Sequence, residues 1–311
     1  MQINVSKKTL RLSLIALTFI CTLFTLGIIL MNTQQNPTII DASARIGTVT
    51  LNVRDLETVK NFYKDVVMLN ILSESNSEVL FGKGEHEVVR LVESELPENQ
   101  QNEAGLYHVA IVFGSRGELA YHLNNVLEKS LDTYQGSGDH TVSEAFYFSD
   151  PEGNGIEIYF DRPNSEWKYD ANGKIQMGTQ YIDEQAYIKK YLNNEADDSI
   201  KTGHIHLQIG DIRDALDFYV DGLGFEVQAQ MPTALFISAG GYHHHIGLNT
   251  WNSLGAGKRE ETLGLRSFEI LINDLSGIES RLSTKKIEYI KDGNSITVND
   301  PWNNQIRILK I

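Results

Sequence analysis

The chain has 311 residues, one cysteine and a formal net charge of −14 at pH 7. This length suits two domains of ordinary size or one large domain. The acidic balance argues against nucleic acid as a partner, because phosphate binding needs clustered Lys and Arg. The single cysteine excludes disulfides within the chain and thiolate zinc sites, so a bound metal would need His, Asp or Glu ligands.

The first feature along the chain is an apolar segment near the N-terminus. Residues 12–31 carry no charge and follow three basic residues within residues 1–11. The segment is long enough to cross a bilayer as a helix, and basic residues mark the cytoplasmic side. We expect a cytoplasmic segment at 1–11, a single-pass transmembrane anchor at 12–31, a linker at 32–44 and extracytoplasmic domains. Secretion after signal cleavage is the alternative, although no small-residue cleavage site directly follows the apolar stretch.

After the linker the chain repeats itself. Each repeat begins with alternating apolar residues, which predict a strand, and continues into a helical pattern. A matching Asp-Pro turn and a further strand close each half of the chain. The repeated segments are 46–71 and 202–227, 105–127 and 264–285, and 149–160 and 299–310.

This order predicts an α+β fold with antiparallel or mixed sheets. We expect a first domain at 45–163, an inter-domain connection at 164–200 with helical character near 183–194, and a second domain at 201–311. The connection is rich in Asp, Glu, Asn and Lys, which is typical of an exposed linker.

Three segments carry a resemblance to a known family: "GHIHLQIGDIRDALDFYVDGLGF", "SDPEGNGIEIYFDRP" and "SAGGYHHHIGLNTW". They resemble the vicinal-oxygen-chelate superfamily, which includes glyoxalase I, bleomycin-resistance proteins and extradiol dioxygenases. The chain is most similar to two-domain bacterial catechol-2,3-dioxygenase-like proteins, over residues 46–311. The resemblance implies four βαβββ modules forming two domains, with pairs of modules making a cup around one divalent metal.

The resemblance also implies where metal ligands would lie, namely on the first strand of each module and the last strand of one or both. These positions are Thr48, His108, His204 and Ser267 on first strands, and Arg90, Glu157, Gly247 and Arg307 on last strands. Only His108, Glu157 and His204 have side chains that suit a metal. Two histidines and one carboxylate are the facial triad of non-haem Fe(II) oxygenases, so Fe(II) is the expected metal, with Mn(II) as an alternative.

The pairing of modules decides whether these ligands meet. If modules pair in chain order, His108 and Glu157 lie in one cup and His204 in the other. If the second module pairs with the third, all three converge, and the first and fourth modules form an empty partner cup. We prefer the second arrangement, because it accounts for all three residues.

Other histidines are expected around this site. His206 shares a strand face with His204 and is expected beside the metal or in place of His204. The run His243–His245 is expected on the last strand of the third module, with His243 and His245 facing the cup and His244 facing away. We predict His245 as the acid–base residue, supported by His243, and expect His140 to border the pocket.

The predicted function is Fe(II)-dependent extradiol cleavage of a catechol-type substrate. Its partners would be a small aromatic diol, O₂ and the membrane, with no nucleic acid; a homo-oligomer is an open alternative to a monomer. One rival is a non-catalytic small-molecule or metal-binding protein of the bleomycin-resistance type. The other is a glyoxalase-like isomerase that uses another divalent metal, such as Mn, Ni or Zn.

Overall fold

The chain contains four copies of a βαβββ unit, as predicted. This computed structural model describes residues 39–171, 173–193 and 199–311. The first unit comprises β1 (Arg45–Val53), α2 (Leu56–Asn61), β2 (Asn70–Glu74), β3 (Glu78–Lys83) and β4 (His86–Glu93). The second comprises β5 (Gly105–Phe113), α3 (Arg116–Lys129), β6 (Tyr134–Asp139), β7 (Ser143–Ser149) and β8 (Gly155–Asp161). The third comprises β9 (Ile200–Gln208), α5 (Ile212–Ala215), β10 (Glu226–Met231), β11 (Ala234–Ser238) and β12 (Ile246–Asn249). The fourth comprises β13 (Gly264–Ile272), α6 (Ser276–Lys285), β14 (Tyr289–Asp292), β15 (Ser295–Asn299) and β16 (Gln305–Lys310).

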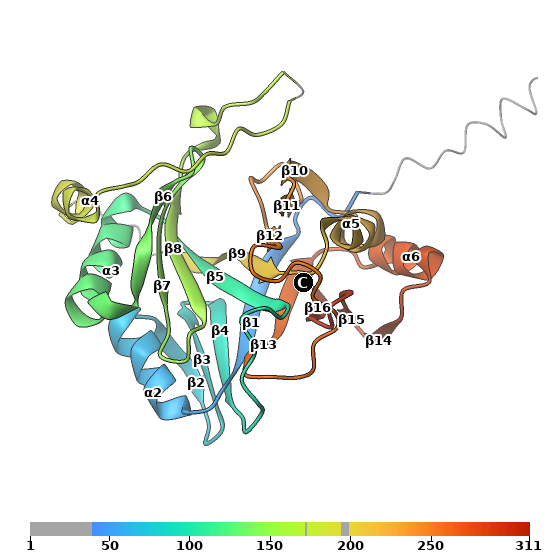
Figure 1. Cartoon of the computed structure of the whole chain (residues 1–311), viewed down its shortest axis with the longest axis horizontal. Helices are drawn as coiled ribbons and strands as arrows, with labels where there is room; N and C mark the ends of the chain where they lie inside the picture. The colour runs from blue at the N-terminus through green and yellow to red at the C-terminus, as the bar shows by residue number, and fades with distance from the viewer. Residues whose placement is uncertain (1–38, 172, 194–198) are drawn as a thin grey trace, which may run out of the picture. The chain divides into compact units, whose positions relative to one another are not determined.

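Strands pair across the two halves of the chain. Within the described residues they form two mixed sheets of eight strands each. Sheet A has the order β14-β15-β16-β13-β1-β4-β3-β2, and sheet B has the order β10-β11-β12-β9-β5-β8-β7-β6. Sheet A therefore joins the fourth unit to the first, and sheet B joins the third to the second (Figure 1). The preferred pairing of modules is confirmed, and pairing in chain order is wrong.

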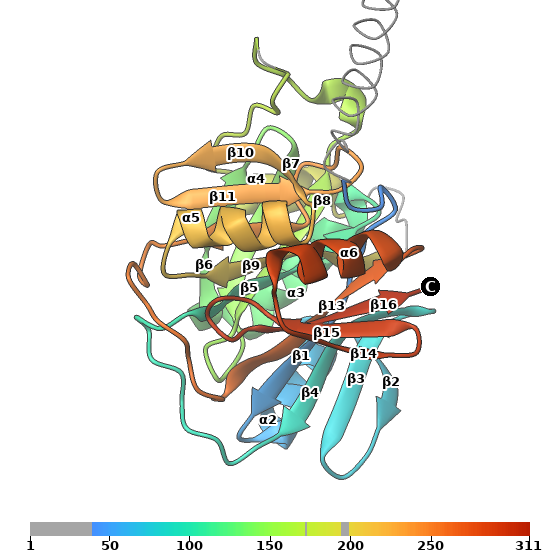
Figure 2. The same ribbon diagram turned by 90° about the vertical axis from the view of Figure 1, so that its right-hand side faces the viewer.

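Helices, in contrast, pair within each half of the chain. A π-helical turn, η1 (Phe62–Val66), extends α2, and its Val66 carbonyl accepts a hydrogen bond from Asn125 of α3 at 2.7 Å. A second π-helical turn, η4 (Leu216–Gly222), extends α5 and pairs with α6 through Lys285 and Asp221 at 2.8 Å. Figure 2 shows α5 and α6 side by side. Strands and helices thus tie different pairs of units together.

In the second half of the chain, the Phe-Tyr pair at 218–219 meets the Asp-Pro turn at 300–301 in the core. The hydroxyl of Tyr219 donates a hydrogen bond to Asp300 Oδ2 at 2.9 Å, and both side chains are buried. The other oxygen of Asp300 accepts from the backbone N–H groups of Trp302 and Asn304 at 2.9 and 2.8 Å. The motif therefore fixes the last turn of the fourth unit against the helix of the third.

The predicted inter-domain connection contains local structure. A 3₁₀ turn, η3 (Asn164–Glu166), is followed by a buried Trp167, whose ring centroid lies 5.6 Å from that of His243. Further on, helix α4 (Glu184–Tyr191) falls within the stretch where helical character was expected. A short 3₁₀ turn, η2 (Leu131–Thr133), precedes β6. The connection thus packs against His243 through the ring of Trp167.

The described residues cover only part of the segment for which the N-terminal predictions were made. The cytoplasmic segment 1–11 and the anchor 12–31 lie outside the described residues. Of the predicted linker, residues from Ile39 are described, and the N–H of the buried Ile40 donates to Gly224 O at 2.9 Å. None of the helices in the described ranges is long and apolar enough to span a bilayer.

Candidate metal centre

The three predicted ligands come from adjacent strands at the middle of sheet B. Strand β5 pairs in parallel with β8 and antiparallel with β9, and this register places Ala110 opposite both Glu157 and His204. His108 precedes Ala110 by two residues and so shares its face of the sheet. All three side chains therefore lie on one face of the sheet around Ala110, whose small side chain leaves space between them.

The ligand atoms lie close together. Glu157 Oε2 is 2.9 Å from His108 Nε2 and 3.2 Å from His204 Nε2. One ligand atom from each residue lies within 4.8 Å of the others, and all three side chains are buried. No other group of three or more His, Cys, Asp or Glu with such spacing occurs among the described residues. The structure thus brings the predicted triad together.

Unpaired nitrogens show that this group fits a metal. His108 Nε2 approaches Glu157 without forming a hydrogen bond, and His204 Nδ1 has no partner, although both atoms are buried. Buried polar atoms without a partner cost free energy and call for an explanation. Two imidazoles and a carboxylate are a donor set for Fe(II), Mn(II) or Zn(II). A divalent metal between the three side chains would account for the unsatisfied His108 Nε2, which faces Glu157.

Charge states of the triad suit metal binding. Burial alone would raise the pKa of Glu157, but the neighbouring His204 and His108 hold that pKa well below its ordinary value. Burial lowers the pKa of His204, opposed by the Glu157 carboxylate. An ionised carboxylate and a neutral imidazole are the forms that coordinate a metal.

His206 lies beside the triad and is held away from it. Its Nε2 accepts a hydrogen bond from the Asn249 side-chain amide at 3.1 Å. A Cβ on Gly247, the neighbour of His206 on β12, would come within 2.9 Å of the His206 ring. The room left by Gly247 is therefore filled by the ring of His206. Burial lowers the pKa of His206 well below its ordinary value, so its ring is a neutral wall of the cup.

The histidine run departs from the prediction. Strand β12 begins at Ile246, so all three histidines lie in the preceding loop and do not alternate as strand residues. Positive φ angles at Gly240 and Gly241 turn the chain there. As a result the ring centroid of His244 lies 4.1 Å from that of His204. The predictions of a strand at the run and of a His244 that faces away are wrong.

The other two histidines of the run have different partners. His245 Nδ1 accepts a hydrogen bond from the backbone N–H of Ala239 at 3.1 Å, and burial lowers its pKa to about 3. His243 is fully buried, and its Nε2 lies 2.7 Å from Asp161 Oδ1. Within the run, the ring of His244 lies nearest to the predicted ligand His204, with centroids 4.1 Å apart, and the ring of His243 is the next nearest at 6.2 Å.

His140 reaches the site through a tyrosine that the sequence did not single out. Its Nε2 is 2.7 Å from the hydroxyl of Tyr147, and its Nδ1 is 2.9 Å from Gly178 O. Tyr147 is the register partner of Glu157, and its ring centroid is 5.5 Å from that of His108. Burial, followed by the Glu157 carboxylate, raises the pKa of Tyr147 well above its usual range. The register of the hairpin formed by β7 and β8, which places Tyr147 opposite Glu157, was the signal that could have identified Tyr147.

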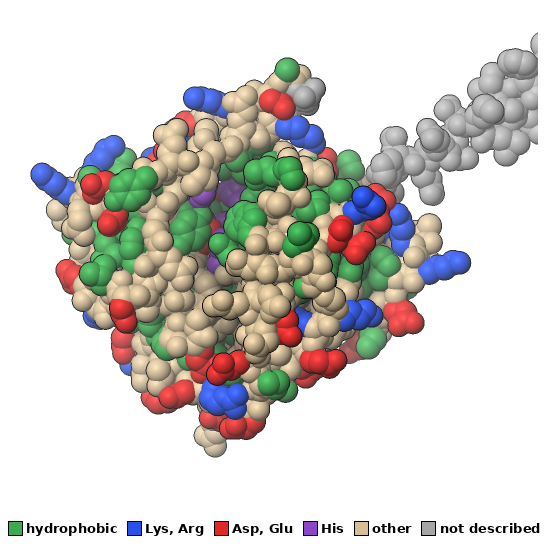
Figure 3. Space-filling view, in the orientation of Figure 1, with side chains coloured by type: hydrophobic (Ala, Val, Ile, Leu, Met, Phe, Trp, Pro, Cys, Tyr) green, Lys and Arg blue, Asp and Glu red, His purple; other side chains and the backbone are tan. Residues whose placement is uncertain are grey.

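Aromatic side chains border the cup. The ring centroids of Tyr107 and Trp251 are 5.3 Å apart, and each lies within 6 Å of His206. Trp251 is 49% exposed, whereas His206 is buried. Figure 3 shows histidine side chains at the bottom of a hollow that hydrophobic side chains surround. The cup that contains the buried triad is thus open to solvent, and its aromatic rim suits an aromatic molecule.

Sheet A carries ion pairs at the equivalent positions. Arg307 pairs with Glu269 at 2.9 Å, and Arg90 pairs with Glu78 at 3.1 Å. Thr48 donates a hydrogen bond to Glu87 at 3.0 Å. Arginines, which cannot coordinate a metal, therefore occupy both last-strand positions of this sheet.

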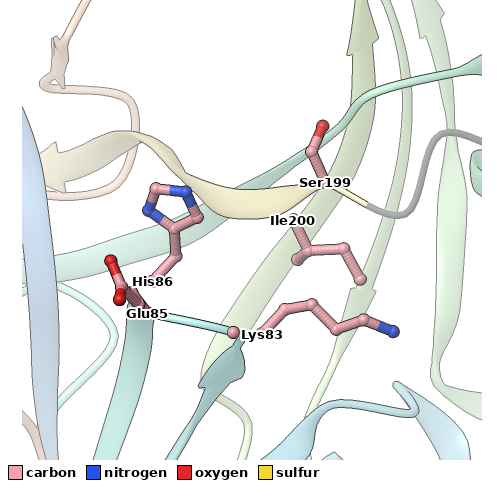
Figure 4. A pocket seen from close by; sticks show the side chains of 6 residues that line it. Lys83, Glu85, His86, Ser199 and Ile200 are labelled. Carbon is pink, nitrogen blue, oxygen red and sulfur yellow. The ribbon is translucent and has the colours of Figure 1, made fainter.

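A separate open pocket lies between the β3–β4 turn and the start of β9. Lys83, Glu85 and His86 line one side of it, and Ser199 and Ile200 line the other (Figure 4). It includes none of the three predicted ligands. The chemistry of the triad therefore belongs to the cup of sheet B.

Known proteins resemble this chain over most of its length. A family model described as the Glyoxalase/Bleomycin resistance protein/Dioxygenase superfamily matches residues 45–158 and 201–308. The chain is 36% identical over 283 residues to a Bacillus subtilis (strain 168) protein named catechol-2,3-dioxygenase, covering 85% of this chain and 96% of that protein.

Solved structures share the fold at low sequence identity. The CppA protein of Streptococcus pneumoniae is 14% identical with a TM-score of 0.55, covering 88% of this chain and 100% of that one. Glyoxalase I from Zea mays is 14% identical with a TM-score of 0.51, covering 86% of this chain and 92% of that one. The resemblance inferred from the sequence, including the likeness to a catechol-2,3-dioxygenase, is confirmed. The chain belongs to the Glyoxalase/Bleomycin resistance protein/Dioxygenase superfamily.

Proposed function

We propose that this protein is an extradiol dioxygenase that uses one Fe(II) ion and O₂ to open the ring of a catechol-type diol. The observation that carries the proposal is the convergence of His108, Glu157 and His204 from three adjacent strands. The relative named catechol-2,3-dioxygenase supports the substrate class. Arginines at the equivalent positions of sheet A leave sheet B as the reactive half.

The triad would hold the metal, and the remaining residues would handle the substrate. Fe(II), when bound, would supply a Lewis acid for the diol and a route for electrons from the diol to O₂, with no net change in its own oxidation state. The aromatic rim of Tyr107 and Trp251 would guide the substrate ring into the cup, because aromatic pairs favour stacked and edge-to-face contact. Burial of the triad would limit the access of bulk water to the metal to the open side of the cup.

His244 is the best-placed acid–base residue. Its ring packs against His204, and its Nε2 makes no hydrogen bond to any described residue. Burial lowers the pKa of His244 well below its ordinary value, so the ring is neutral and its Nε2 lone pair can accept a hydrogen bond from a diol hydroxyl. The predicted acid–base residue, His245, instead uses its Nδ1 to accept a backbone hydrogen bond.

Tyr147 would support the other side of the substrate. If His140 is neutral and donates from Nδ1 to Gly178 O, its Nε2 accepts the hydroxyl proton of Tyr147. The Tyr147 oxygen then keeps a lone pair for a substrate hydroxyl. Because burial and Glu157 disfavour the tyrosinate, this group would work as a neutral hydrogen-bonding residue.

Anaerobic reconstitution of the full chain with Fe(II), followed by catechol and air, tests the proposal. We expect oxygen uptake and a yellow ring-cleavage product, with a large loss of kcat in His244→Asn and none in the matched control His86→Asn, whose side chain is exposed. Absence of turnover with a fully loaded metal site would contradict it. Tight catechol binding without oxygen uptake would favour the binding-protein alternative, and thiol-dependent isomerisation with another metal would favour the glyoxalase-like one.

We further propose that residues 12–31 anchor the protein in the cell membrane with its domains outside the cytoplasm. The support is the charge-free apolar segment preceded by basic residues. Alkaline extraction of membranes should leave the full-length chain in the pellet, and protease added outside the cell should digest the domains. A shortened chain in the medium would identify signal cleavage instead.

A further inference from the structure

A chain of hydrogen bonds runs from Asp161 to the face of the metal group. Asp161 Oδ1 is 2.7 Å from His243 Nε2, and His243 Nδ1 is 2.8 Å from His244 Nδ1. Beyond this, the His244 ring lies against His204. The two contacts therefore connect a carboxylate on β8 to the imidazole proposed as the acid–base residue.

The hydrogen-bonding properties of each group set the positions of the protons. A carboxylate accepts hydrogen bonds and cannot donate them, so His243 Nε2 must carry a proton. In a neutral imidazole the other nitrogen is then an acceptor, and His243 Nδ1 has to accept from His244 Nδ1. A neutral His244 protonated at Nδ1 has its lone pair at Nε2, the nitrogen that makes no hydrogen bond to a described residue.

Packing holds this arrangement in place. The hydroxyl of Tyr242 donates to Asp161 Oδ2 at 2.7 Å and pairs with the hydroxyl of Tyr159 at 2.8 Å. The His243 ring is fully buried, with ring centroids 4.1 Å from Tyr242 and 5.6 Å from Trp167. Both oxygens of Asp161 are thus engaged and the His243 ring cannot rotate freely.

We propose that Asp161 and His243 are positioning residues that fix His244 in the tautomer protonated at Nδ1, so that Nε2 meets the substrate as a proton acceptor. For neutral His243 and His244 the tautomer follows from the hydrogen bonds, whereas its use in catalysis rests on the proposed dioxygenase function. Partners that orient an imidazole through its second nitrogen are a general way of setting which nitrogen reacts.

Nuclear magnetic resonance tests the tautomer directly in the full chain labelled with ¹⁵N-histidine. Long-range ¹H–¹⁵N correlations would be recorded without metal and with Zn(II), and His243→Gln and His244→Gln would assign the signals. We expect a proton on Nδ1 and none on Nε2 in His244, and the reverse in His243. A proton on Nε2 of His244, or on both nitrogens of His243, would overturn the proposal whatever the protein catalyses.

Asp161→Asn tests the role of the carboxylate, with the exposed Asp132→Asn as the matched control. An amide can donate to His243 Nε2, so we expect the Nε2-protonated tautomer of His244 to become populated. We expect kcat for ring cleavage to fall about 10- to 100-fold, with KM and metal content nearly unchanged. Unchanged His244 signals and kcat in Asp161→Asn would contradict the proposal. If Asp161→Asn lowered both the metal content and the melting temperature without changing the tautomer of His244, Asp161 would be a structural residue and the proposal would be wrong.

Discussion

Replacing Gly203 with alanine should destabilise the protein without altering a ligand. The added Cβ would overlap the hydroxyl oxygen of Tyr159 and lie 2.6 Å from its Cζ. Tyr159 is fully buried, so its ring would have to shift and lose its 2.8 Å hydrogen bond to Tyr242. Overpacking costs about 1–3 kcal/mol and the lost hydrogen bond about 1 kcal/mol, which together give about 2–4 kcal/mol. For a domain of this size, the melting temperature should fall by about 4–16 °C.

Thermal unfolding followed by circular dichroism measures this effect. Gly257→Ala is the matched control, because its added Cβ would meet no atom within 4 Å. Tyr159→Phe in the Gly203→Ala background removes the overlapped oxygen and should recover part of the loss, although the contact with Cζ remains. A Gly203→Ala protein that melts within about 1 °C of the wild type would refute this packing of Tyr159. Destabilisation by even 1 kcal/mol would lower the melting temperature by about 2–4 °C.

Three further changes probe the cup. Gly247→Ala would place a Cβ 2.9 Å from the His206 ring and should lower stability by about 1–3 kcal/mol in urea unfolding; a neutral effect would contradict the close packing of His206. Burial lowers the pKa of His245 to about 3 in the folded protein, against about 6.5 in the unfolded chain. Because the unfolded chain takes up a proton that the folded protein does not, the free energy of unfolding falls as the pH drops below about 6.5. At pH 5 this linkage lowers the free energy of unfolding of the wild type by about 2 kcal/mol. Between pH 7 and 5, the free energy of unfolding of His245→Asn should therefore fall by about 2 kcal/mol less than that of the wild type, and equal decreases would contradict the assignment. Trp251→Ala should raise KM for catechol about 2- to 10-fold with metal content unchanged, and an unaltered KM would remove Trp251 from the substrate path.

Repeats in the sequence predicted the four units well, because each unit has its own strand alternation and helix start. Asp211, for example, stands just before the helical pattern of its repeat and caps α5 by accepting from the N–H groups of Arg213 and Asp214. Pairing of the units was harder to predict, since identical local patterns fit either order. The convergence of His108, Glu157 and His204 was the one feature that favoured the order seen in the structure.

The surroundings of the triad were less predictable. The alternation rule failed at His243–His245, because two glycines with positive φ place the run in a loop. Tyr147 and Asp161 were missed, although each lies on or beside a strand of the site. Their roles depend on contacts with His140 and His243, which are separated from them in sequence and are visible only in three dimensions.

Metal titration calorimetry on the full chain is the most direct test of the central claim. We expect the wild type to bind one Fe(II) ion per chain under anaerobic conditions. His108→Ala, Glu157→Gln and His204→Ala should each abolish tight binding, whereas His206→Ala should still bind one ion, because His206 Nε2 is engaged by Asn249. Tight binding of one ion in all three triad variants would contradict the account.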